Sequence, residues 1–332
     1  MPTPYLIGLL GDWPVLILGF VLLYFGAEWL VGASSELALK LGISTLIIGL
    51  TVVAFGTSSP ELLVSLQAAL QGKGDMALGN VVGSNICNLA LMLGIAALIT
   101  PIKVGTQVVK RELPIMLLVT GVFLAILWDR QVERWEAAVL FGGIILYLLR
   151  SFLMAKSGRE APEILKDFQG EVDAKSQTRR PVPFLLFLVG LGVGLMALGA
   201  DFMVASGSNL ARSFGVSEAV IGLTLFALGT SLPELATTIV AAIKKEVDII
   251  TGNLVGSNIF NMLVVIGITG MVIPLSGGQI MWADLGMMAG VSLLLAPLMA
   301  SGLRISRAEG LFLVLSYVGY IFWVFLGPGL TK

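Results

Sequence analysis

The chain reads I-G-L-T-V-V-A-F-G-T-S-S-P-E-L from Ile48 to Leu62, and a close copy, I-G-L-T-L-F-A-L-G-T-S-L-P-E-L, follows from Ile221 to Leu235. A second pair has the same offset of 173 residues: G-N-V-V-G-S-N-I-C-N (Gly79–Asn88) and G-N-L-V-G-S-N-I-F-N (Gly252–Asn261). Both copies of the longer motif place a glutamate after a proline inside an apolar stretch. Because ionisable groups are costly in a bilayer, duplicated glutamates in broken helices indicate the substrate site of a transporter.

The composition is that of an integral membrane protein, since 57% of the 332 residues are hydrophobic and 12% are charged. The absence of histidine excludes imidazole-based zinc sites and His-dependent triads, and a single cysteine excludes an internal disulfide. Stretches of about 20 apolar residues predict an all-α integral membrane protein with ten transmembrane helices. These spans are expected at roughly 14–38, 43–70, 76–100, 109–128, 134–153, 184–210, 216–243, 248–273, 280–301 and 308–328.

The constant offset divides the chain into two related repeats of five expected spans, 1–153 and 184–332. The motif helices are the second and third spans of each repeat: 43–70, 76–100, 216–243 and 248–273. Because five is odd, the second repeat enters the membrane inverted relative to the first. In inverted-repeat transporters the substrate site lies near the midplane, where the two copies meet.

The stretch 154–183 between the repeats carries mixed charges and is predicted to be a cytoplasmic linker. With ten spans, this orientation puts both termini outside and roughly three times as many Lys and Arg residues inside as outside, in agreement with the positive-inside rule. We therefore expect a multi-pass protein of the cell membrane, in contact with lipid. No cofactor and no nucleic-acid partner are expected.

Prolines at positions 60 and 233 predict a break in each motif helix. Each lacks an N–H, so carbonyls near Ala54–Thr57 and Ala227–Thr230 are expected to have no helical partner. The candidate ligands are carboxylates, hydroxyls and side-chain amides: Glu61, Glu234, Thr57, Thr230, Ser84, Ser257, Asn88 and Asn261. Oxygen-only sites suit calcium, which takes 6–8 such ligands, and subsets of these oxygens could hold sodium.

Structural roles are the alternative for several of these residues. Any single Gly, Ser or Thr in a membrane helix can serve close packing instead of ion binding. Glu28 aligns with Asp201 at the same offset, and these two acids are either ligands or gate and packing carboxylates bonded to a neighbouring helix. Cys87 is replaced by Phe260 in the other copy, so it is expected in the core.

The two complete motif pairs resemble the paired repeats of the calcium/cation antiporter superfamily. The ten-span architecture is most similar to that of prokaryotic sodium/calcium exchangers. The resemblance implies a five-plus-five inverted fold in which the motif helices form the core. It also implies that the first and sixth spans form a mobile gating pair.

By this resemblance, Glu61 and Glu234 bind calcium or sodium at different times, and Thr57 and Thr230 complete the calcium site. Asn88 and Asn261 lie at the centre as weaker ligands. The implied flanking sodium sites are Ala54, Thr57, Ser58 and Ser84 on one side, and Ala227, Thr230, Ser231 and Ser257 on the other. Some members have an aspartate at the position of Asn261. The amide found here argues against potassium co-transport.

The sequence thus predicts a secondary antiporter, and not an enzyme, that exchanges sodium for calcium by alternating access. A proton/calcium or other divalent-cation exchanger is the main alternative. The duplicated hydroxyls favour sodium, because protons need no such coordination. A membrane-embedded enzyme has little support, since the chain has no nucleophile with a base and no diphosphate site. A passive channel fits poorly with duplicated acids, which suit tight binding better than permeation.

Overall fold

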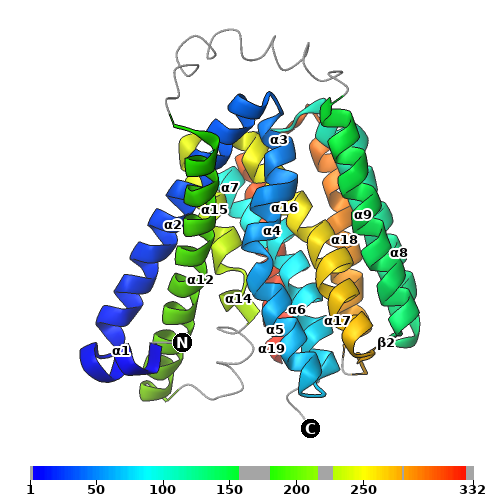
Figure 1. Cartoon of the computed structure of the whole chain (residues 1–332). Coiled ribbons are helices and arrows are strands. Elements are labelled where there is room, and N and C mark those ends of the chain that lie inside the picture. The colour runs from blue at the N-terminus through cyan, green and yellow to red at the C-terminus, as the bar shows by residue number, and fades with distance from the viewer. Residues whose placement is uncertain (1–2, 157–179, 216–226, 279, 327–332) are drawn as a thin grey trace.

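The computed structural model describes residues 3–156, 180–215, 227–278 and 280–326, and nearly all of them are helical (Figure 1). Seven described helices are long and apolar enough to cross a membrane, or eight if the pair at Thr45–Leu70, bent by 41°, is one span. The expected span 134–153 lies within a further helix, and the expected span 216–243 falls partly outside the described residues. The membrane-protein class is therefore confirmed, whereas the number ten stays a prediction.

The first half contains the helices and strands α1 (Thr3–Leu10), α2 (Asp12–Leu41), α3 (Thr45–Ile48), η1 (Gly49–Val53), α4 (Ala54–Thr57), α5 (Ser59–Leu70), α6 (Gly74–Ile86), η2 (Cys87–Met92), α7 (Leu93–Ile99), β1 (Ile102–Lys103), η3 (Val108–Glu112), α8 (Leu113–Ile126), η4 (Leu127–Asp129), β2 (Gln131–Val132) and α9 (Arg134–Lys156). The second half contains α12 (Val182–Ser213), α14 (Ala227–Gly229), α15 (Leu232–Lys244), α16 (Val247–Phe260), η6 (Asn261–Val265), α17 (Ile266–Val272), β3 (Leu275–Ser276), α18 (Trp282–Ala300), β4 (Arg304–Ile305) and α19 (Arg307–Leu326).

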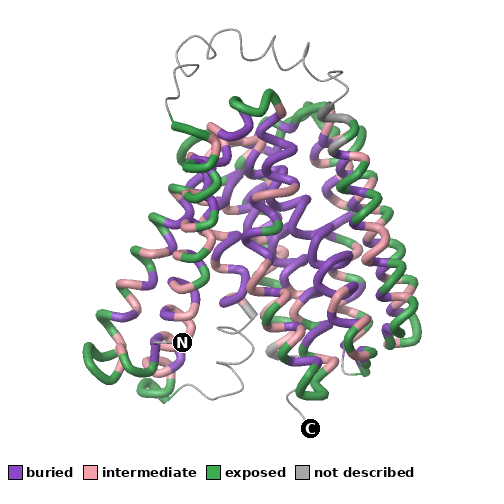
Figure 2. The backbone as a smooth tube through the Cα atoms, in the orientation of Figure 1, coloured by how far each residue is buried: buried purple, intermediate pink, exposed green. Residues whose placement is uncertain are grey.

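The motif helices occupy the centre of the molecule, and the other long helices surround them (Figure 2). In the most apolar window of Val247–Val272, 83% of the residues are buried, and in that of Gly74–Ile99 the share is 72%. The other five spanning helices have only 17–39% of that window buried. Apolar side chains cover the exposed faces of these outer helices, as is required of surfaces that contact lipid.

The helices α2 and α12 pack against each other along their length at one side of the core (Figure 1). Their contact depends on four glycines. A Cβ atom added to Gly19 would lie 2.8 Å from the carbonyl oxygen of Gly199, and one added to Gly26 would lie 2.7 Å from that of Gly192. Small residues of this kind let membrane helices approach closely. Gly19 matches Gly192, and Gly26 matches Gly199, at the offset of the motifs, so equivalent residues of the two halves form this crossing.

Two short antiparallel ladders also connect the halves. β1 pairs with β4, and β2 pairs with β3. At the offset of 173 residues, β1 corresponds to β3, and β2 corresponds to β4. Exchanging the two halves therefore turns the ladder β1–β4 into the ladder β3–β2. This reciprocal pairing is what a duplicated structure with a twofold relation predicts. It supports the repeat that the sequence indicates.

Candidate ion-binding site

The two motif glutamates lie completely buried in the core. Glu61 is in the first turn of α5 and Glu234 in the first turn of α15, and both have 0% exposure. The Oε1 atom of Glu61 accepts a hydrogen bond of 3.1 Å from Ser231, and the Oε1 atom of Glu234 accepts one of 3.1 Å from Ser58. Each glutamate is thus held by the serine that precedes the glutamate-bearing helix in the other repeat.

The broken helices explain how two carboxylates reach the middle of the protein. Ser58 and Ser231 have nearly the same backbone angles, with φ −82° and ψ 3° in the first copy and φ −91° and ψ 6° in the second. A new helix begins after each serine, with a proline at its start. A glutamate in the first turn lies near free N–H groups and the positive end of the helix dipole, both of which favour a carboxylate.

We expected the carbonyl groups along each helix break to have no helical hydrogen-bond partner, and two of these carbonyls do have one. The Ala54 carbonyl accepts from the Ser58 N–H at 3.0 Å, and the Leu228 carbonyl accepts from the Ser231 N–H at 3.1 Å. The helix therefore continues to the serine before it ends, because the proline removes only its own N–H from the ladder. The Phe55 carbonyl accepts the side-chain hydroxyl of Ser59 at 2.7 Å.

The two central asparagines are also completely buried and bonded across the repeats. The Nδ2 atom of Asn88 donates to Oδ1 of Asn258 at 3.0 Å, and Nδ2 of Asn261 donates to Oδ1 of Asn85 at 3.1 Å. Asn85 and Asn258 were not predicted as parts of the site. They could have been found, because both lie within the duplicated motif at the constant offset.

The threonines show the same cross-repeat arrangement. The hydroxyl of Thr57 donates to Oδ1 of Asn253 at 3.1 Å, and that of Thr230 donates to Oδ1 of Asn80 at 3.1 Å. Asn80 and Asn253 were missed too, although they are equivalent residues of the duplicated motif. In total, six of the seven asparagines in the sequence lie in the two motifs: Asn80, Asn85, Asn88, Asn253, Asn258 and Asn261.

Two of the remaining predicted ligands, Ser84 and Ser257, lie close to these residues. Ser84 Oγ is 3.0 Å from Ser231 Oγ, and Ser257 Oγ is 3.4 Å from Thr57 Oγ1. Ala54 is buried and packs against Gly256, where an added Cβ would lie 2.8 Å from the Ala54 methyl group. Ala227 begins α14, and its side chain lies outside the described part of the chain.

Four oxygens in this cluster have no hydrogen-bond donor among the described residues. They are one carboxylate oxygen of each glutamate and the amide oxygen of each central asparagine: Glu61 Oε2, Glu234 Oε2, Asn88 Oδ1 and Asn261 Oδ1. All four are acceptors, and they form two repeat-related pairs. A buried acceptor without a donor costs about 1–3 kcal/mol, and more when it is charged. Cations are one kind of partner that such acceptor oxygens can take.

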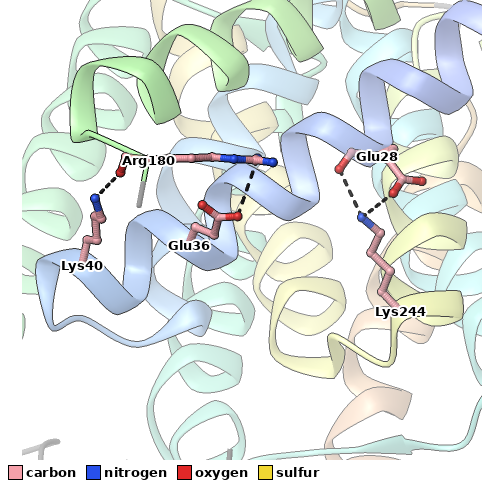
Figure 3. A network of polar contacts seen from close by, with 5 residues as sticks. All are labelled: Glu28, Glu36, Lys40, Arg180 and Lys244. Atoms are coloured by element: carbon pink, nitrogen blue, oxygen red, sulfur yellow. Dashed lines mark hydrogen bonds and ion pairs between the residues drawn. The ribbon is translucent and has the colours of Figure 1, made fainter. Parts of the chain in front are cut away.

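Glu28 and Asp201 are not part of this cluster. Glu28 Oε1 lies 2.9 Å from Lys244 Nζ, and this ion pair joins α2 to α15 (Figure 3). Asp201 accepts a hydrogen bond from the hydroxyl of Thr3 on α1. Both acids are therefore bonded to a neighbouring helix, which confirms the structural alternative. Cys87 is 2% exposed and lies in the core, as expected.

A profile described as "Sodium/calcium exchanger protein" matches residues 12–153 and 184–326 of the chain. This chain belongs to the sodium/calcium exchanger family. It is 40% identical to "Putative antiporter CaxA" of Alkalimonas amylolytica over 93% of this chain and 97% of that protein. It is 32% identical to "Sodium/calcium exchanger MaX1" of Methanosarcina acetivorans over 94% of this chain and 97% of that protein.

The fold is similar to solved structures of the sodium-calcium exchanger NCX_Mj. One of them superposes with a TM-score of 0.78 at 30% identity and covers 94% of this chain and 97% of that chain. The resemblance found in the sequence motifs is thereby confirmed. The family and these relatives also support a membrane transporter of cations over a membrane-embedded enzyme.

Proposed function

We propose that this protein exchanges sodium for calcium across the cell membrane by alternating access. The observation that carries the proposal is the set of four buried acceptor oxygens without donors among the described residues, two of which belong to carboxylates. Two carboxylates balance the charge of one calcium ion or of two sodium ions. A site that is stable only with a cation bound is what a carrier of cations requires.

The coordination chemistry favours calcium as the divalent substrate. All atoms of the cluster that could bind a metal are hard oxygens, from carboxylates, amides, hydroxyls and backbone carbonyls. Calcium takes 6–8 oxygens in a flexible geometry, whereas magnesium demands a near-ideal octahedron and keeps several waters. In this proposal Glu61, Glu234, Thr57 and Thr230 bind calcium, and Asn88 and Asn261 contribute weaker ligands at the centre.

Sodium is the proposed counter-ion because the glutamates are surrounded by hydroxyls. A proton needs only the carboxylate, whereas a sodium ion needs several neutral oxygens in addition. The proposed flanking sodium sites combine Ala54, Thr57, Ser58 and Ser84 in one set, and Ala227, Thr230, Ser231 and Ser257 in the other. A proton/calcium exchanger, in which the glutamates take up protons, is the alternative.

The proposed architecture is ten membrane helices in two inverted repeats, 1–153 and 184–332, joined by a cytoplasmic linker at 154–183. The reciprocal ladders and the reciprocal glycine contacts between α2 and α12 support the twofold relation of the repeats. The distribution of Lys and Arg supports termini on the outside. In this arrangement α2 and α12 form the mobile pair that opens the site to either side.

Competition between the two ions tests the shared site. We expect sodium to raise the apparent Kd for calcium of the detergent-purified protein, because both ions need the same two carboxylates. Since two sodium ions replace one calcium ion, the Kd should rise about with the square of the sodium concentration once sodium dominates, that is, about fourfold per doubling. Isothermal titration calorimetry at constant ionic strength, with N-methylglucamine in place of sodium, measures this. An apparent Kd for calcium that does not change with the sodium concentration but changes with pH would favour the proton exchanger.

A further inference from the structure

We infer that Asn85 and Asn258 are positioning residues that orient the amides of Asn261 and Asn88, so that an oxygen and not an N–H group is left for the transported cation. This inference rests on the proposed function and deepens it. It assigns a role to two asparagines whose side chains accept hydrogen bonds from the central amides. Its chemical basis is the two-sided character of the amide group.

The geometry consists of two reciprocal bonds between buried side chains. Asn85 and Asn258 each have 1% exposure, and Asn88 and Asn261 have 0%. The donor is in both cases the Nδ2 atom of the central asparagine, and the acceptor is the Oδ1 atom of a residue in the other repeat, at 3.0 and 3.1 Å. The Oδ1 atoms of Asn88 and Asn261 have no donor among the described residues.

An asparagine can present either end of its amide to a neighbour. One end accepts through two lone pairs, and the other donates through two N–H groups, while the two ends have almost the same size. A hydrogen-bond partner must therefore decide which end faces a site. The Oδ1 atom of Asn85 accepts from Nδ2 of Asn261 in the observed orientation of the Asn261 amide. If that amide were flipped, its Oδ1 atom would face Oδ1 of Asn85, and the two acceptors would repel each other.

The flipped orientation would harm ion binding in two ways. It would point N–H groups, which carry partial positive charge, toward a cation. In the empty site the same N–H groups could bond to a carboxylate and compete with the ion for it. The acceptors supplied by Asn85 and Asn258 exclude this competitor, so their removal should weaken calcium binding without altering the glutamates.

Replacing the central asparagine by aspartate provides a sharp comparison. A carboxylate has two equivalent oxygens and no donor, so it has no wrong orientation to exclude. The orienting role of Asn85 should therefore exist in the protein with Asn261 and vanish in the Asn261→Asp variant.

The test is a double-mutant cycle on calcium binding, measured by calorimetry on the purified full-length protein. The four proteins are the wild type, Asn85→Leu, Asn261→Asp and the double variant. Leucine resembles asparagine in size but offers no acceptor. We expect Asn85→Leu to raise the Kd for calcium about tenfold when asparagine occupies position 261, and less than about twofold when Asn261→Asp is also present.

A matched control is Asn209→Leu, which removes a half-buried amide that donates to Asp12 at 2.9 Å and is not itself a proposed ligand. It should leave the Kd for calcium within about twofold of the wild type. Thermal unfolding in the absence of ions reports whether each variant is folded. If Asn85→Leu does not fold, the symmetric cycle of Asn258→Leu with Asn88→Asp makes the same test at the repeat-related position.

Equal losses of affinity with and without Asn261→Asp would overturn the inference, because a packing role does not depend on the chemistry of residue 261. An unchanged Kd in Asn85→Leu would overturn it as well. Either result would leave the proposed function intact, provided that the wild type binds calcium. A wild-type protein that binds no calcium would instead overturn the proposed function, and the inference with it.

Discussion

Glu61→Gln and Glu234→Gln should each reduce calcium exchange at least about a hundredfold while leaving a folded protein. Either change leaves a buried divalent cation facing a single carboxylate, and an uncompensated buried charge costs several kcal/mol. Glutamine is almost isosteric with glutamate and retains an oxygen that can accept from Ser231 or Ser58. The repeat relation predicts that both variants fail alike, because each glutamate has the same kind of surroundings.

The measurement is the initial rate of radioactive calcium uptake into vesicles that contain equal amounts of each purified variant. Glu309→Gln is the matched control, since Glu309 accepts hydrogen bonds from Ser306 at the start of α19, away from the cluster. It makes the same chemical change and should retain exchange. Calcium uptake at the wild-type rate by Glu61→Gln or Glu234→Gln would contradict the proposed role of the glutamates.

Calcium efflux should nearly cease when the opposite side contains neither calcium nor sodium. With both glutamates ionised, the empty site holds two buried negative charges without a partner, and enclosing them costs several kcal/mol per ion. One calcium ion or at least two sodium ions cancel this charge. Only loaded carriers are therefore expected to move between the two access states, and antiport follows from electrostatics. A third sodium ion would add net positive charge and make exchange electrogenic.

Vesicles loaded with radioactive calcium and diluted into three media measure this effect. Efflux into calcium or into sodium should be fast, and efflux into N-methylglucamine should be slower by about two orders of magnitude, which corresponds to a barrier higher by about 2.7 kcal/mol. Vesicles without protein give the background. Efflux into N-methylglucamine at a rate near that of exchange would indicate a channel or a uniporter instead of a carrier.

The duplication marks the residues that the sequence proposes for the site. Glu61 and Glu234 could be chosen from their position in apolar segments, and the serines, threonines and central asparagines followed from the repeated motifs. The structure places the side chains of these residues in one buried cluster. The motif helices of the two repeats meet there at equivalent points of the duplicated sequence.

Cross-repeat bonding was not predictable in the same way. Asn80, Asn85, Asn253 and Asn258 lie in the motifs, but a neutral amide in a membrane helix fits close packing as well as a polar network. Only the positions of their partners distinguish the two roles. The partners of these four asparagines in the other repeat lie 150–196 residues away along the chain. The free carbonyl expected at Ala54 was wrong because Pro60 removes only its own N–H, and the N–H of Ser58 still bonds to Ala54.

Calcium uptake driven by sodium tests the proposed exchange most directly. Vesicles containing the purified protein are loaded with sodium, and radioactive calcium is added in a sodium-free medium, with a protonophore present to collapse any pH gradient. We expect rapid uptake that stops when sodium is made equal on both sides or is replaced inside by N-methylglucamine. Uptake that needs no sodium gradient and follows an imposed pH gradient, once the protonophore is omitted, would contradict sodium/calcium exchange.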